Sequence, residues 1–153
     1  AGQHVTWFPS YGPEMRGGKA RCTVVVSDEE IGAPLVRRPS AAIVLNLPSM
    51  EAFEPAIKSG GVLVVNSSLV PQKSERTDIN VLYVPASDMA IELGNVRIAN
   101  VICLGALVQA AGIVSLEGGA AESAITPGVR SGLRLARLVN GLGGERLGQA
   151  RQA

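Results

Sequence analysis

Five short runs of apolar, β-branched and aromatic residues predict five β-strands. They are HVTWF (4–8), ARCTVVVSD (20–28), AAIVLN (41–46), GVLVVNSS (61–68) and INVLYVP (79–85). Runs of this composition, bounded by polar and glycine-containing segments, are typical of strands. The last three are nearly continuous in apolar residues, as in strands that helices cover on both faces of a sheet. The pattern therefore predicts a sheet buried between two helical layers.

The segment between the third and fourth runs predicts a helix. PSMEAFEPAIKSGG (48–61) offers Ser49 as the N-cap, acidic residues in the first turns, and Gly60 and Gly61 as the stop. A strand, a helix and a second strand of this length are typical of a right-handed parallel crossover. We therefore expect the third and fourth strands to be parallel.

The second half of the chain predicts further helices. Residues 84–95 read as a strand end and a short helix closed by Gly94, and residues 96–112 as a helix with almost no polar face. Such a helix should be buried on nearly every side, against the sheet or a partner subunit. Residues 115–125 begin like a capped helix, whereas 129–153 are basic and interrupted by glycine. We expect the segment 129–153 to be frayed.

These elements predict an α/β fold with three layers, α/β/α, around a mostly parallel, mixed sheet. The length of 153 residues favours a single domain over 1–153. The second run is expected to be an antiparallel or edge strand, because the connection into it is too short for a helical crossover.

Composition and charge exclude several classes of protein. A formal net charge of +1 gives no general attraction for nucleic acid or for a membrane surface. No apolar run approaches the ~20 residues of a transmembrane helix, and no targeting signal is visible, so we expect a cytoplasmic protein. Cys22 and Cys103 lack the spacing of iron–sulfur or zinc ligands and are expected to be buried, reduced thiols. The single histidine, His4, is expected to be structural or at the surface.

The stretch PSYGPEMRGGKARC (9–22) is the richest in chemistry, with glycines and bases between two apolar runs. Gly17 and Gly18 would let a ligand approach the backbone closely, and Arg16 beside them could bind phosphate or carboxylate oxygens. The alternative is a tight structural turn with solvated charges. Composition alone leaves both interpretations open.

Polar residues at strand ends are weaker candidates. If the first strand is parallel to the later ones, Ser10 shares the carboxyl rim of the sheet with three residues that follow later strands, namely Asn46, Asn66 and Ser67. Asn100 belongs to the same weak group. For Asn46, Asn66, Ser67 and Asn100, the alternative role is to cap the backbone at the ends of strands and helices.

The chain shows no paired carboxylates, no nucleophile beside a base, no Ser/His/Asp set, and no G-x-G-x-x-G after a strand. These residues favour a binding or subunit-assembly domain over a complete enzyme.

Four segments strongly resemble the gamma subunit, or catalytic-domain gamma module, of the 2-oxoacid:ferredoxin oxidoreductases. They are residues 2–36, which contain SYGPEMRGG, and residues 46–70, 84–107 and 112–117. This form of the loop looks most like the 2-oxoglutarate branch of the family, with the branched-chain 2-oxoacid branch close behind, whereas pyruvate-type gamma subunits usually carry a different version. Family members begin with an additional strand, a glycine-rich turn and a helix, and we expect that strand and helix to be missing here.

The resemblance implies oxidative decarboxylation of a 2-oxoacid with coenzyme A, giving an acyl-CoA, carbon dioxide and reduced ferredoxin. Thiamine diphosphate, magnesium and the iron–sulfur clusters would lie on alpha, beta and delta partner subunits, which would also contact ferredoxin, and none would be held by this chain alone. The gamma subunit would close the active site and help to bind coenzyme A. It would supply no catalytic residue and no metal ligand.

A cation beside two permissive glycines at the exit of a strand leads us to a hypothesis about five residues. Tyr11, Glu14 and Arg16 would shape the wall of the active site, and Arg16, Gly17 and Gly18 would hold an anionic group of coenzyme A or a carboxylate of the alpha subunit. Two alternatives remain: a stand-alone nucleotide-binding or regulatory α/β module, and a purely architectural subunit.

Overall fold

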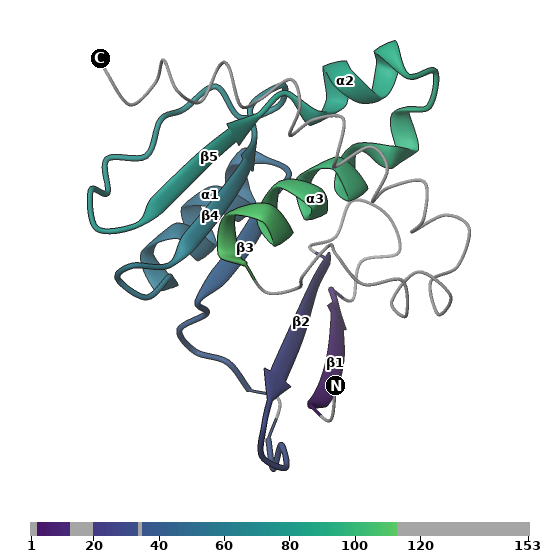
Figure 1. The fold of residues 1–153 in the computed structure, drawn as a ribbon. Coiled ribbons are helices and arrows are strands. Elements are labelled where there is room, and N and C mark those ends of the chain that lie inside the picture. Colours follow the sequence, from purple (N-terminus) through teal and green to yellow (C-terminus); the bar gives the residue numbers. More distant parts are fainter. Residues whose placement is uncertain (1–2, 13–19, 34, 113–153) are drawn as a thin grey trace. The chain divides into compact units, whose positions relative to one another are not determined.

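A computed structural model describes residues 3–12, 20–33 and 35–112 of the chain. Contacts divide the chain into two compact units, Ala1–Arg38 and Pro39–Ala153. Figure 1 labels the elements of each. The prediction of one domain over 1–153 stays a prediction, and the predicted elements within 115–125 and 129–153 lie outside the described residues.

The first unit contains a β-hairpin. Strands β1 (His4–Tyr11) and β2 (Ala20–Ser27) pair antiparallel, with His4 opposite Ser27 and Tyr11 opposite Ala20. The antiparallel direction predicted for the second strand is confirmed. The two strands form a sheet of their own, however, and do not join the parallel strands in one mixed sheet. Eight residues lie between Tyr11 and Ala20, too few for a helical crossover, so β1 pairs antiparallel with the next strand of the sequence.

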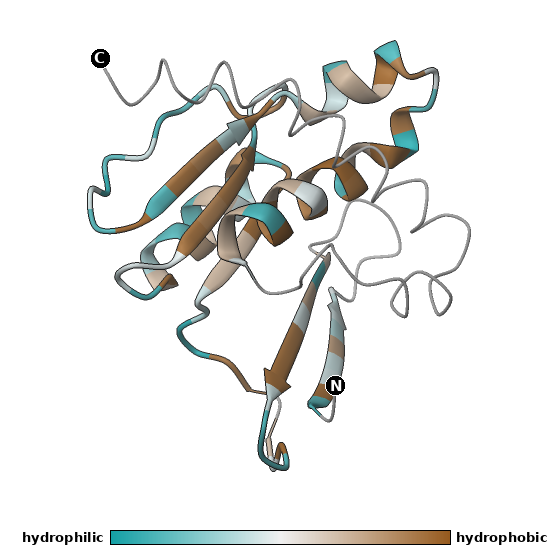
Figure 2. Ribbon diagram, in the orientation of Figure 1, coloured by the Kyte–Doolittle hydropathy of each residue, from teal (hydrophilic) through white to brown (hydrophobic). Residues whose placement is uncertain are grey.

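The second unit is built on a parallel sheet with the order β3-β4-β5. The strands are β3 (Ala41–Val44), β4 (Val62–Asn66) and β5 (Asn80–Val84). All residues of the central strand β4 are buried, and β4 and β5 are hydrophobic through most of their length (Figure 2). This burial follows from the continuous apolar runs of the sequence.

Helices cover the sheet on both faces (Figure 1). Val62 and Val64 of β4 belong to the core beneath the helices α2 (Ala86–Glu92) and α3 (Ala99–Ala111). Leu63 and Val65 point to the other face and pack with Met50 of α1 (Leu47–Phe53). Because side chains alternate along a strand, β4 contributes to two cores at once. The predicted α/β class, with helices on both sides of a sheet, is confirmed.

Helix α1 begins earlier than predicted. The side chain of Asn46 accepts a hydrogen bond of 2.9 Å from the Ser49 N–H, so Asn46 is the N-cap and the prediction of Ser49 was wrong. Pro48 is tolerated in the first turn, where the missing N–H has no helical partner to lose. The helix continues as the 3₁₀ turn η1 (Glu54–Ala56) and ends before Gly60, which adopts a φ of 76° in the following turn.

The second predicted helical region contains α2, the 3₁₀ turn η2 (Val96–Ile98) and α3. Gly94 closes α2 with a φ of 76°, as predicted. The sheet-facing side of α3 is buried, whereas Leu104 is 45% and Val96 63% exposed in the isolated chain. Burial of these residues against a partner subunit stays a prediction. No helix within the described part of the chain is long and apolar enough to cross a membrane.

Candidate functional site

The predicted anion site lies at the connection between β1 and β2. Tyr11 is the last residue of β1 and is 74% exposed. The other four predicted site residues, Glu14, Arg16, Gly17 and Gly18, lie outside the described residues. The register places Tyr11 opposite Ala20, so these four residues belong to the segment that joins this closing pair.

The carboxyl rim of the parallel sheet holds three of the weaker candidates. Asn46 follows β3, Asn66 ends β4, and Ser67 comes directly after it. Their predicted placement on one rim is confirmed. Ser10 belongs instead to the antiparallel hairpin. The prediction required β1 to be parallel to the later strands, and its pairing with β2 removes that condition.

Asn66 connects the rim to helix α2. Its side chain is buried, its Nδ2 donates to Ser87 Oγ at 2.9 Å, and its Oδ1 accepts from the Ser87 N–H at 3.4 Å. Its carbonyl oxygen accepts hydrogen bonds from the N–H groups of Leu69 and Val70. A buried amide is retained in a core only when its polar atoms are paired, as they are here. Asn66 therefore fixes the end of β4 to the first turn of α2.

Ser68 and Asp88 form a second tie between the same elements. Ser68 Oγ donates to Asp88 Oδ2 at 2.9 Å and accepts from the Asp88 N–H at 3.2 Å. At the other helices, Asn46 caps α1, and the Asn100 side chain accepts from the Val101 N–H at 2.9 Å. The backbone-capping role is thus confirmed for Asn46. Sequence reasoning missed Ser68, Ser87 and Asp88, although the polar ends of two predicted strands could have found them: NSS (66–68) for Ser68, and ASD (86–88) for Ser87 and Asp88.

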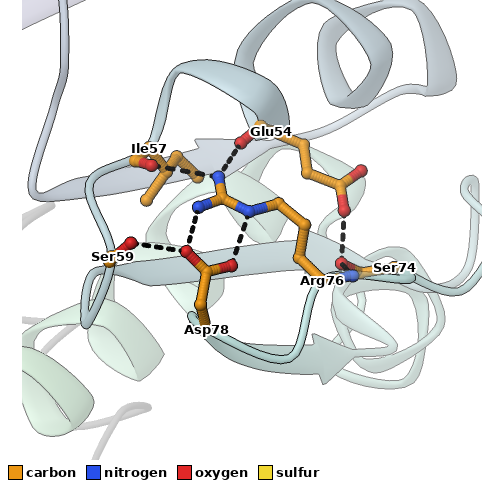
Figure 3. Close-up of polar contacts among 6 residues, drawn as sticks. All are labelled: Glu54, Ile57, Ser59, Ser74, Arg76 and Asp78. Atoms are coloured by element: carbon orange, nitrogen blue, oxygen red, sulfur yellow. Dashed lines mark hydrogen bonds and ion pairs between the residues drawn. The ribbon is translucent and has the colours of Figure 1, made fainter.

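The amino end of the sheet contains a second polar network, centred on Arg76 (Figure 3). Its guanidinium donates to both carboxylate oxygens of Asp78, at 2.8 and 2.6 Å. Its Nη1 also donates to the carbonyl oxygens of Glu54 at 2.6 Å and Ile57 at 3.0 Å. Two serines complete the network: Ser59 donates to Asp78, and Ser74 to Glu54.

The Arg76 network is a structural clamp. The hydrogen bonds from Arg76, and next the one from Ser59, hold the pKa of the Asp78 carboxyl well below its usual range. The network joins the segment before β5 to the end of α1 and η1. Ligands of open α/β sheets gather at the opposite, carboxyl end of the strands. Sequence reasoning missed this network, and the two-residue spacing of Arg76 and Asp78 gives no signal for the carbonyl contacts.

The two thiols differ from each other. Both cysteines are free; Cys103 is buried and Cys22 is exposed, so the expected burial was right for Cys103 and wrong for Cys22. Burial raises the pKa of the Cys103 thiol to about 11. His4 is exposed. Within residues 3–12, 20–33 and 35–112, no group of three His, Cys, Asp or Glu side chains could hold a metal ion.

Comparison with known proteins decides the family. The family described as pyruvate ferredoxin/flavodoxin oxidoreductase matches residues 1–132. The chain belongs to this family. Among members, it is 36% identical over 137 residues to the 2-oxoglutarate synthase subunit KorC of Methanothermobacter marburgensis, covering 86% of this chain and 73% of KorC. It is also 36% identical over 116 residues to the ketoisovalerate oxidoreductase subunit VorA of the same organism. That alignment covers 76% of this chain and 24% of VorA, so the chain spans about a quarter of that relative.

Solved structures of the oxidoreductase family have the same fold. The gamma subunit of a keto/oxoacid ferredoxin oxidoreductase from Geobacter sulfurreducens matches with a TM-score of 0.66 and 28% identity, covering 88% of this chain and 79% of that one. The 2-oxoglutarate:ferredoxin oxidoreductase of Magnetococcus marinus matches with a TM-score of 0.67 over 90% of this chain and 26% of its own, at 18% identity, which shows the fold alone. The resemblance to oxidoreductase gamma subunits is confirmed.

Proposed function

We propose that the chain works as the gamma subunit of a multi-subunit enzyme that oxidatively decarboxylates a 2-oxoacid with coenzyme A, giving an acyl-CoA, carbon dioxide and reduced ferredoxin. The observation that carries this proposal is the alignment with KorC, which spans 86% of this chain and 73% of a separate oxidoreductase subunit. The likeness to the Geobacter gamma subunit supports it independently. The chain is expected to be inactive alone.

The proposed substrate is 2-oxoglutarate, because KorC is a subunit of 2-oxoglutarate synthase. A branched-chain 2-oxoacid and pyruvate are the alternatives, since VorA belongs to a ketoisovalerate oxidoreductase and a Thermococcus litoralis relative is common to pyruvate and ketoisovalerate oxidoreductases. The test is to purify the complex through a tag on this chain and to measure ferredoxin reduction with each acid, with and without coenzyme A. Faster turnover of either alternative acid would contradict the choice of 2-oxoglutarate.

The proposed partners are alpha and beta subunits, with a delta subunit in some assemblies, and ferredoxin reached through them. Thiamine diphosphate, magnesium and iron–sulfur clusters are assigned to those partners. No step of the chemistry is assigned to this chain. We also propose a cytoplasmic location, which the two free cysteines support. A monomer that binds nucleotide and co-purifies with no oxidoreductase chain would contradict the proposed function.

We propose that the loop after Tyr11 lies at the coenzyme A site. The Magnetococcus enzyme with the same fold was solved with coenzyme A bound, and Arg16 stands beside the permissive pair Gly17 and Gly18. Tyr11 and Glu14 would shape the wall next to it. A guanidinium next to exposed amides can bind a phosphate or carboxylate through charge-assisted hydrogen bonds.

The test compares Arg16→Ala with Arg97→Ala in the assembled enzyme. Arg97 is an exposed arginine of η2 and serves as the matched control. A charge-assisted contact is worth about 1.5–3 kcal/mol, so Arg16→Ala should raise the KM for coenzyme A about tenfold or more while Arg97→Ala leaves it unchanged. An unchanged KM in an intact Arg16→Ala complex would remove Arg16 from the site and favour a purely architectural loop.

A further inference from the structure

One face of the β1–β2 hairpin carries only apolar side chains. The register pairs Val5 with Val26, Trp7 with Val24, Pro9 with Cys22 and Tyr11 with Ala20, and every second residue of a strand points to the same side. These eight residues are called the apolar hairpin face below. The opposite face mixes apolar with polar residues, among them His4, Thr6, Ser10, Arg21 and Thr23. The hairpin therefore has a face that carries no charge.

The apolar hairpin face is open to solvent. The exposed fractions are 63% for Val5, 62% for Trp7, 74% for Tyr11, 58% for Val24 and 46% for Val26. With ~150–250 Å² for a fully covered aromatic side chain and ~60–120 Å² for a valine, these five expose roughly 300–540 Å². Contiguous apolar patches of ~300–600 Å² are often functional. A two-stranded hairpin also needs packing against another element to be stable in water.

The size of the face argues against a second copy of this chain as its occupant. A standard interface buries about 800 Å² on each partner, and a symmetric dimer through this face alone would bury only about half of that. A larger partner can cover the face and continue beyond it. Two comparisons favour such a partner, because the matching region makes up 24% of VorA and 26% of the Magnetococcus chain. In those proteins a domain of this type adjoins a much longer part of the same polypeptide.

We propose that the apolar hairpin face is the surface through which this chain binds the larger subunit of its oxidoreductase. Trp7 and Tyr11 are the anchors, because interface hot spots are enriched in Trp and Tyr that enter desolvated pockets. The partner surface is apolar and carries no unpaired charge against the face, since a buried unpaired charge would oppose binding. This inference rests on the proposed function.

The first test uses the native thiols. Cys22 lies on the apolar hairpin face and is exposed, whereas Cys103 is buried. The full-length chain alone and the assembled enzyme are treated with N-ethylmaleimide, and labelling of each cysteine is followed by mass spectrometry. We expect Cys22 to react at least tenfold more slowly in the assembled enzyme, while Cys103 stays unlabelled in both and reports that the α/β unit is folded.

The second test needs only the assembled enzyme. A benzophenone amino acid at position 24, in place of Val24, is irradiated in the complex, and the mass of the adduct identifies the chain it meets. In parallel, Val24→Lys should weaken binding of the larger subunit about thirtyfold or more, the effect of losing a hot spot. The control is Ile91→Lys, since Ile91 of α2 is 60% exposed, close to the 58% of Val24. It should leave binding within twofold.

The outcomes separate this inference from the proposed function. An active complex in which Cys22 reacts as fast as in the free chain, or an adduct to a second copy or within the same chain, overturns the hairpin proposal and leaves the function intact. Recovery of the tagged chain without any oxidoreductase subunit overturns both. An adduct to the larger subunit together with slowed labelling of Cys22 supports both.

Discussion

Replacing Gly61 by alanine should destabilise the α/β unit more than the same change at Gly60, Gly94 or Gly112. A Cβ at this position would lie 2.7 Å from Ile57 Cγ2 and 2.8 Å from the carbonyl oxygens of Lys58 and Ser40. Real Cβ atoms do not approach so closely, so something must move. Both oxygens already accept hydrogen bonds, from the N–H groups of Gly61 and Val62 at 2.9 and 3.0 Å. Backbone shifts that relieve the clash would therefore break contacts at the start of β4.

The expected cost follows from these contacts. Overpacking costs about 1–3 kcal/mol, and each weakened backbone hydrogen bond adds about 1 kcal/mol, so Gly61→Ala should lower the free energy of unfolding by ~2–4 kcal/mol. Gly60 has open space around it but a φ of 76°. Alanine there should cost ~1–2 kcal/mol, the price of a left-handed backbone. Gly32 has neither constraint, and its substitution should change stability by less than ~0.5 kcal/mol.

The three variants can be compared by urea unfolding of the full-length chain, followed by far-UV circular dichroism and fitted with a common m value. In thermal scans, each kcal/mol corresponds to a Tm shift of roughly 2–4 °C for a chain of about 150–250 residues. The order of stability should be Gly32→Ala, then Gly60→Ala, then Gly61→Ala as the least stable. If Gly61→Ala proved as stable as Gly60→Ala, the close approach of the backbone at Gly61 would be refuted.

Two further predictions concern the polar networks. Asn66→Ala should lower the free energy of unfolding by about 1–3 kcal/mol. A double-mutant cycle with Ser87→Ala should give a coupling energy of about 1 kcal/mol, because the two side chains are hydrogen-bonded. Single effects that simply add would contradict these hydrogen bonds. Because the pKa of Asp78 is lowered in the folded chain, the stabilisation from its carboxylate is complete above the unfolded pKa of about 3.9 and is lost as pH falls through the folded value. Urea midpoints at pH 3 and pH 6 should therefore differ more in the wild-type chain than in Asp78→Asn, and an equal difference would refute this reasoning.

The strands of the parallel sheet could be predicted from sequence because burial on two faces requires a nearly continuous run of apolar residues. The run GVLVVNSS contains β4, and every residue of that strand is buried. The placement of β1 was harder. His4, Thr6 and Ser10 alternate with Val5, Trp7 and Pro9, which indicates a strand with one apolar face but not the sheet it joins. The short connection predicted the antiparallel direction of β2, but no local pattern showed that β1 and β2 form a sheet of their own.

Helix ends were predicted less well than helices, for a local reason. Asn46 and Ser49 are both good N-caps, and Pro48 fits the first turn of a helix that begins after Asn46. Gly60 and Gly61 looked like one helix stop. The structure gives them separate roles, one as a turn with positive φ and one as a point of close backbone contact with Lys58 and Ser40. A close approach depends on residues far along the chain and is invisible in the sequence.

The candidate site was predictable only as a region. The rim positions of Asn46 and Asn66 follow from strand ends, whereas the pairing of Asn66 with Ser87 requires the register between β4 and β5. The contacts of Arg76 with the carbonyl oxygens of Glu54 and Ile57 require the end of α1 to lie beside the segment before β5. Polar residues separated by about twenty positions meet only once the crossover has formed.

Substitutions in the two units should have different effects, on stability in the α/β unit and on subunit binding in the hairpin. In the α/β unit, polar side chains are hydrogen-bonded to each other, as in the pairs Asn66–Ser87 and Arg76–Asp78. Substitutions in these pairs should therefore lower stability and affect catalysis only through that loss. In the hairpin, Trp7 and Tyr11 are largely exposed, so their substitution removes little from the free chain. With the proposed interface, the main cost of the change should appear in binding to the larger subunit. A Trp7→Ala chain that unfolds at the wild-type urea concentration but fails to hold the larger subunit would show this division directly, whereas an equal loss of stability and binding would place Trp7 in the core of the free chain.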